Sequence, residues 1–131
     1  MSPVQRDITG ATLSFSLADE LRILRAELDA AGERIGRTLL KNGPLRATLV
    51  GLKAGGELRT HRADGPITVH VLEGAIDFTV GGTSWPLPAG TLFSLEAGVP
   101  HSVASQDGGI FLLTVVALAP SGAAGPPVGE S

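Results

Sequence analysis

The spacing of apolar residues changes partway along this chain, and the change divides it into two parts. Between positions 16 and 31, leucines recur every three or four residues, at Leu17, Leu21, Leu24 and Leu28. That spacing predicts an amphipathic helix over 16–31, with Ser16 as its N-cap and Gly32 as a left-handed stop. We expect the leucine stripe to pack on the outside of a barrel or on a partner subunit.

From Arg34 onward, apolar and polar residues alternate, which predicts β-strands. The expected strands span residues 35–41, 45–53, 56–61, 66–73, 75–81, 83–87, 91–96, 101–105 and 109–118. Turns rich in glycine and proline separate most of them, and Glu73 and Gly74 form the expected turn between 66–73 and 75–81. Many short strands with evenly spaced turns are typical of an antiparallel sandwich or closed barrel, so the predicted class is all-β.

The strand around Val69 indicates which side chains face inward. Ile67, Val69 and Val71 lie on one side of it and alternate with a set that includes His70. If the apolar side lines the barrel, His70 points outward, toward the helix, solvent or a second subunit.

These patterns divide the 131 residues into three segments. We expect a flexible N-terminal arm over 1–15, a single domain over 16–119 with its barrel at about 34–118, and a disordered tail over 120–131. A chain of this length with 43% apolar residues can bury a core of its own.

Composition narrows the classes of partner. The net charge of −3 does not favour a nucleic-acid partner, and the absence of cysteine excludes disulfides and thiolate metal sites. The longest apolar run, 110–119, is about half of the roughly 20 residues that a membrane span needs. The first residues lack the apolar core of a secretory signal, so we expect no membrane partner and a cytoplasmic location.

Residues 53–103 resemble the cupin family in two motifs. The first motif of that family contains a glycine, a His-x-His, a glutamate and a second glycine, and its positions here are occupied by Gly55, Gly56, His61, Ala63, Ile67 and Gly74. The second motif contains glycine, Pro-x-Gly, histidine and asparagine, and its positions are occupied by Gly82, Pro88, Gly90, His101 and Ser105. The resemblance implies a double-stranded β-helix, or jelly-roll, barrel.

The resemblance also implies a degenerate metal site. In metal-binding cupins, both first-motif histidines, the glutamate and the second-motif histidine bind one divalent metal ion. Carried over by position, only His61 and His101 remain as ligands, because Ala63 and Ile67 carry no ligand atom. Iron, manganese, nickel or zinc would be weakly held unless a substrate or Asp64 completed the shell.

Three interpretations of His61 and His101 stay open. They could be a pocket pair bonded to water or to each other, a weak or substrate-completed metal site, or a metal-free site. In the last case the pair would bind an anionic or polar ligand or act as acid and base. Arg59 and Arg62 flank His61, and either could meet a carboxylate on a ligand; Arg59 is the one we predict as a site residue.

Two functions follow from these interpretations. The first is a small-molecule-binding cupin protein with an incomplete metal site, acting as a sensor or auxiliary protein. The alternative is a metal-dependent cupin enzyme of the dioxygenase or isomerase type with a ligand-completed site. We expect a homodimer in either case, from the habit of the family and from the apolar last strand, 109–118.

Overall fold

The computed structural model describes residues 6–118, and within them one helix precedes eight strands. These elements are α1 (Leu17–Ala30), β1 (Arg34–Asn42), β2 (Leu45–Leu52), β3 (Glu57–His61), β4 (Ile67–Val80), β5 (Thr83–Pro88), β6 (Leu92–Leu95), β7 (His101–Ala104) and β8 (Gly109–Val116). The predicted all-β class is confirmed.

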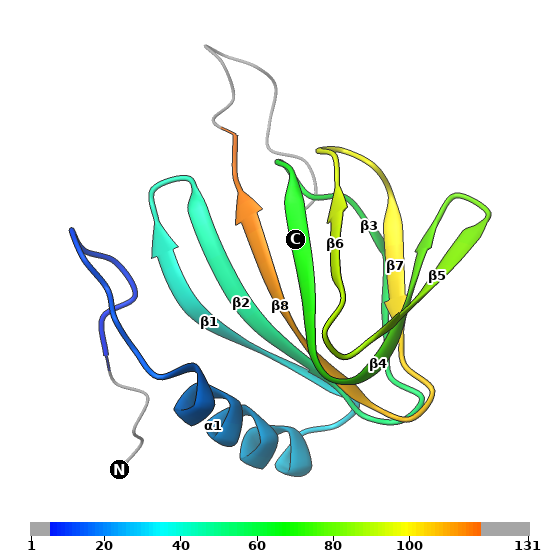
Figure 1. The fold of residues 1–131 in the computed structure, drawn as a ribbon, viewed down its shortest axis with the longest axis horizontal. Coiled ribbons are helices and arrows are strands. Elements are labelled where there is room, and N and C mark those ends of the chain that lie inside the picture. Colours follow the sequence, from blue (N-terminus) through cyan, green and yellow to red (C-terminus); the bar gives the residue numbers. More distant parts are fainter. Residues whose placement is uncertain (1–5, 119–131) are drawn as a thin grey trace.

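The strands form a curled antiparallel arrangement in which β4 belongs to two sheets. Its first half pairs with β8 and β6, and β8 continues through β2 to β1. Its second half pairs with β5 and β7, and β7 continues to β3. Figure 1 shows the resulting curl from β1 at one side to β5 at the other. This is the expected jelly-roll architecture.

The predicted turn at Glu73 and Gly74 is wrong, because β4 continues through it as one strand of 14 residues. A register shift between Val71 and Glu73 and a left-handed φ of 67° at Gly74 bend the strand without reversing it. The hairpin turn comes later, where Gly81 has a φ of 60° between β4 and β5. The bend allows one strand to serve both sheets.

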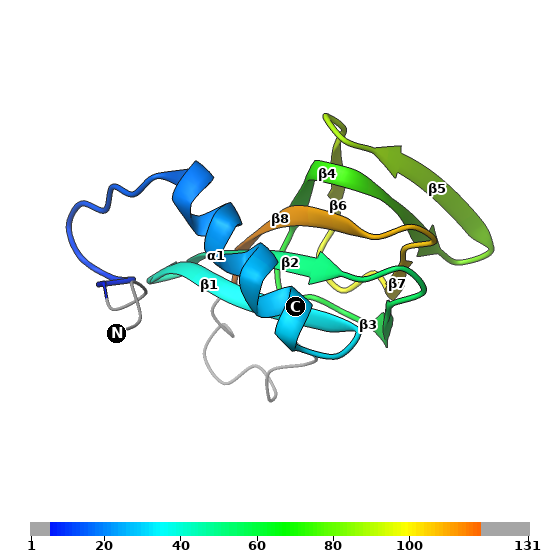
Figure 2. The same ribbon diagram turned by 90° about the horizontal axis from the view of Figure 1, so that it is seen from below.

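Helix α1 begins as predicted, since the Ser16 hydroxyl accepts a hydrogen bond from the backbone N–H of Asp19. Its end differs from the prediction. Ala31 is already extended and Gly32 does not adopt the left-handed conformation, because the chain runs directly into β1 without a reversal. The buried leucines Leu24 and Leu28 face the sheet, and α1 contacts β1 and β2 from outside the curl, as Figure 2 shows.

The main core lies between the two sheets. On β4, Ile67, Val69 and Val71 are at most 3% exposed and belong to this core, whereas His70 is exposed on the opposite side of the strand. The predicted facing of this strand is therefore confirmed.

Residues 6–15, for which the sequence predicts an arm, contain no helix or strand but lie along β1. The Ile8 carbonyl accepts from the backbone N–H of Lys41, and the Gly10 carbonyl accepts from the Asn42 side chain. Their flexibility stays a prediction, and the tail predicted over 120–131 lies outside the described residues. Over residues 6–118, no helix has the length and apolar character that crossing a membrane requires.

The apolar last strand, from which we expected a homodimer, lies between β2 and β4. Ile110, Phe111 and Val115 are buried within the chain itself, so packing inside one molecule accounts for most of its apolar character. Dimerisation stays a prediction.

Candidate functional site

A pocket of about 520 Å³ opens between the two sheets. Its walls are largely apolar, and they come from β1, β2, β3, β4, β7 and β8. The predicted residues His61, His101 and Arg59 all line it. Residues that are 40 positions apart in the sequence thus meet in one cavity.

His61 and His101 are register partners on neighbouring strands, His61 at the end of β3 and His101 at the start of β7. Their ring centroids lie 4.4 Å apart, with the ring planes at 60°. Between Leu58 and His61 the ladder contains an extra residue relative to β7. Because of this irregularity, Leu58 and His61 both line the pocket although they are three positions apart, an offset that places side chains on opposite faces of a regular strand.

Each imidazole is oriented by a backbone carbonyl two residues earlier in its own segment. The His61 Nδ1 lies 2.8 Å from the Arg59 carbonyl oxygen, and the His101 Nδ1 lies 2.9 Å from the Val99 carbonyl oxygen. A carbonyl oxygen only accepts, so each Nδ1 carries the proton. Among the described residues, nothing hydrogen-bonds to either Nε2, and neither is a buried atom lacking a partner, so both are open to the pocket.

His101 is buried, with only 4% of its surface exposed, and it packs against apolar neighbours. Burial lowers the pKa of His101 below its ordinary value. The hydrogen bond to Val99 opposes the change, and the nearby His61 adds to it. The ring is therefore neutral at physiological pH, with the lone pair on Nε2.

Two arginines line the pocket from exposed positions. Arg59 was expected from the sequence, but Arg34, at the start of β1, was not. The Arg34 Nη1 donates a long hydrogen bond of 3.4 Å to the Glu57 carbonyl oxygen, a contact between β1 and β3, which do not pair with each other. No local sequence signal marks Arg34, because its proximity depends on how two distant strands meet. Arg62, the other arginine that flanks His61, does not line the pocket.

The remaining positions of the degenerate motif do not supply metal ligands. Ala63 and Ile67 are 2% and 3% exposed and belong to the apolar core. Within residues 6–118, no three histidine, aspartate, glutamate or cysteine side chains come close enough together to hold a metal ion, so Asp64 does not complete the set. The residues present therefore do not fit a protein-built metal centre, which needs three or four ligands.

Ser105, which replaces the asparagine of the second motif, has a structural role. Its buried hydroxyl donates to the Ala75 carbonyl oxygen at 2.7 Å and accepts from the backbone N–H of Gly108 at 2.9 Å. These bonds tie the turn after β7 to the bend of β4.

Comparison with known families agrees with this geometry. The sequence profile of the cupin domain matches residues 48–117, which include both histidines. The chain belongs to the cupin family. Among curated proteins, none matches this cupin.

Solved structures share the cupin fold. A Cupin 2 conserved barrel domain protein from Leptotrichia buccalis is 28% identical with a TM-score of 0.62, over 65% of this chain and 41% of that one. A conserved protein of unknown function from Streptococcus pyogenes is 26% identical with a TM-score of 0.62, over 66% of this chain and 76% of that one. A variant of salicylate 1,2-dioxygenase from Pseudoaminobacter salicylatoxidans is 19% identical with a TM-score of 0.72, over 86% of this chain and 37% of that one. At that identity the likeness to the dioxygenase shows the fold alone.

Proposed function

We propose that this cupin is a small-molecule-binding module that takes its ligand beside His61 and His101 without a metal ion held by the protein. The observation that carries the proposal is the pair of imidazoles, 4.4 Å apart, in a largely apolar pocket. Aliphatic side chains stand at the other two ligand positions, Ala63 and Ile67. Such a module would act as a sensor or an auxiliary protein.

The electrostatics of the pocket support a metal-free site. Two imidazoles bring no negative charge to offset a dication, and Ile67 replaces the carboxylate that would. The guanidinium groups of Arg34 and Arg59 add positive charge at the same pocket. A divalent ion would therefore be repelled where a metal-binding cupin attracts one.

Metal content is the first test. The full chain, prepared without a histidine tag, is incubated in turn with Fe(II), Mn(II), Ni(II) and Zn(II), desalted and analysed for bound metal. We expect less than about a tenth of an equivalent, because two imidazoles are fewer than the three ligands of known catalytic sites. The matched controls are His61→Ala/His101→Ala, which removes the pair, and His70→Ala, which removes an exposed histidine on β4.

One equivalent of metal that disappears in the double variant and persists in His70→Ala would overturn the proposal. That result would support a metal-dependent enzyme of the dioxygenase or isomerase type instead.

Ligand binding is the second test. The protein is prepared with ¹⁵N-labelled histidine residues, and their ring signals are followed by NMR. Phenol, benzoate and cyclohexanol are then added in separate titrations. We expect at least one compound to shift the signals of His61 and His101 saturably and to leave His70 unchanged, because only the first two line the pocket. If no compound shifts either pocket histidine, the binding function is wrong.

A further inference from the structure

The inner end of the pocket presents hydrogen-bond acceptors. Both Nδ1–H groups are already used by the carbonyl oxygens of Arg59 and Val99. A neutral imidazole held in this way offers only the lone pair of Nε2. Such a lone pair on Nε2 of the buried His101 favours a ligand group that donates a hydrogen bond, such as a hydroxyl or an N–H.

The outer end of the pocket presents positive charge. Arg34 and Arg59 are exposed and line the pocket, and within the described part of the chain neither forms an ion pair. A guanidinium group stays charged at all physiological pH values and offers five N–H donors. This end therefore favours an anion and disfavours an ammonium group, so the group that donates to the imidazoles is uncharged, and a hydroxyl is the smallest such donor.

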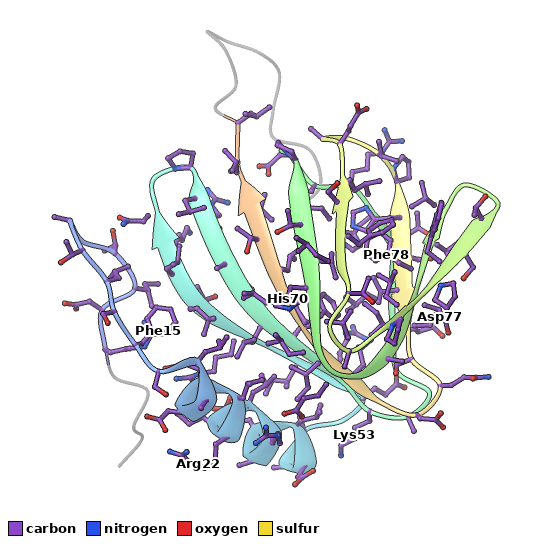
Figure 3. All side chains as sticks on the ribbon, viewed as in Figure 1. Phe15, Arg22, Lys53, His70, Asp77 and Phe78 are labelled. Atoms are coloured by element: carbon purple, nitrogen blue, oxygen red, sulfur yellow. The ribbon has the colours of Figure 1, made fainter. Side chains whose placement is uncertain are left out.

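The walls between the imidazoles and the arginines consist mainly of apolar side chains. Val69, Phe111 and Leu113 come from the sheet opposite β3, and Val103 and Phe78 come from the second sheet. Figure 3 shows Phe78 among the side chains between the sheets. The volume of about 520 Å³ lies in the usual range for small-molecule sites, so the middle of the ligand should be apolar and compact.

We infer that the ligand is a small hydroxy acid with an apolar body. Its hydroxyl donates to Nε2 of His101 or His61, and its carboxylate lies toward Arg59 and Arg34. This assignment rests on the proposed function, since it names the chemical class that the same pocket selects. Because His101 is buried and both arginines are exposed, we place the hydroxyl deeper in the pocket than the carboxylate.

The test uses rigid compounds in which a hydroxyl and a carboxylate are held at a fixed distance from each other. The meta and para isomers of hydroxybenzoate are compared with the matching fluorobenzoates, which keep the shape but donate no hydrogen bond, and with phenol, which has no carboxylate. Binding to the full chain is measured at neutral pH by the same histidine ring signals and by calorimetry. We expect one hydroxybenzoate isomer to bind at least about tenfold more tightly than its fluoro analogue and than phenol.

Variants of the two exposed arginines test whether they bind the carboxylate of the ligand. Arg59→Gln should weaken hydroxybenzoate binding by about tenfold and leave phenol binding unchanged, because only the anion meets the guanidinium group. Arg34→Gln should act in the same direction. Arg62→Gln is the matched control, since it removes the same charge three residues farther along, outside the pocket. Circular dichroism of each variant checks that it is folded.

The outcomes separate this inference from the proposed function. Equal affinity for hydroxybenzoate and fluorobenzoate would overturn the hydroxyl assignment, and equal loss in Arg59→Gln and Arg62→Gln would overturn the carboxylate assignment. In both cases the pocket still binds small molecules and the proposed function stands. If phenol or cyclohexanol binds and no hydroxybenzoate does, the hydroxy-acid class is wrong. If a stoichiometric metal ion is found, the proposed function itself fails.

Discussion

The ring of Phe78 lies nearly parallel to the imidazole of His101, with the ring centroids 5.1 Å apart and the planes at 14°. Phe78 is on β4 and His101 is on β7, and these strands pair directly. His61 packs against the same imidazole at an angle of 60°. The histidine that we place in the ligand site thus contacts both an aromatic ring and a second imidazole, in surroundings that disfavour its charged form.

This environment makes stability depend on pH. The pKa of His101 is lower in the folded protein than its ordinary value of 6.5, so the unfolded chain binds a proton more readily. The free energy of unfolding should be constant above about pH 7.5 and should decrease as the pH falls below 6.5. The slope from one such group is at most about 1.4 kcal/mol per pH unit. Urea unfolding at a series of pH values measures it.

The control for the pH dependence is His101→Leu, which removes the titrating group. In His101→Leu, the decrease in the free energy of unfolding that begins below pH 6.5 should be absent. In His70→Ala, the same decrease should remain. Glu20 and Glu73 have lowered pKa values, so their contribution is lost only at more acidic pH, below their ordinary value of 4.5. An unchanged slope in His101→Leu would contradict the assignment.

Ile67→Glu tests the inward position of the missing carboxylate ligand. Ile67 is 3% exposed among apolar neighbours, so a glutamate there should destabilise the protein by on the order of 3 kcal/mol without metal. Unfolding is measured in the presence of a chelator. Thr68→Glu places the same side chain on the outer side of β4 and should cost about 1 kcal/mol or less. Equal stability of Ile67→Glu and the unmodified protein would show that Ile67 does not face the core.

Glu20 joins three segments of the chain. It is 5% exposed and accepts hydrogen bonds from Arg37 at 2.7 Å and from Arg6 at 3.1 Å, which ties α1 to β1 and to the N-terminal segment. Burial alone would raise the pKa of Glu20, but the two arginines outweigh it and lower the pKa. Glu20→Gln removes the carboxylate shared by two partly buried guanidinium groups, Arg37 at 10% and Arg6 at 22% side-chain exposure. It should lower the free energy of unfolding by about 2 kcal/mol, because Glu27 stays within 4.0 Å of Arg37.

The control for Glu20 is Arg22→Gln on the same helix. Arg22 pairs with Asp19 at 2.9 Å, but both side chains are more than half exposed. Its loss should change the free energy of unfolding by less than about 0.5 kcal/mol. Similar values for the two variants in thermal or urea unfolding would show that the buried pair is no stronger than the exposed one.

Gly74 and Gly81 form a matched pair for the bend in β4. Both have left-handed φ angles, 67° and 60°, but an alanine Cβ at position 74 would lie 2.2 Å from the Gly108 carbonyl oxygen, whereas position 81 is open. Gly81→Ala should cost about 1 kcal/mol, the usual penalty for that conformation. Gly74→Ala should cost about 2 kcal/mol more, because the backbone of the neighbouring turn must move. Equal melting temperatures would contradict the close approach.

Much of the fold could be predicted because it depends on local patterns. The leucines at helical spacing and the hydroxyl of Ser16 specify α1, and the alternation around Val69 specifies which side of β4 is buried. Gly74 was misinterpreted because a left-handed glycine serves equally well in a hairpin turn and in a bent strand. Only the partners on both sides of β4 distinguish these cases.

The candidate site was predictable in part. The two cupin motifs mark His61 and His101, and the sequence also shows that Ala63 and Ile67 replace the other two ligands. Arg34 carries no such signal, because β1 and β3 are the two ends of the strand order and only the curl of the sheet brings both to one pocket. Likewise, no sequence pattern shows that each Nδ1 is committed to a carbonyl oxygen.

The sequence by itself determined the helix, most of the strands, the facing of β4 and the identity of the two imidazoles, because these follow from residue type and spacing along one segment. Only the tertiary structure decided that the rings lie 4.4 Å apart, that one is buried against Phe78, and that two arginines share their pocket. The physical reason is that proximity between distant strands depends on register and bending. Those are properties of the whole sheet, to which every strand contributes.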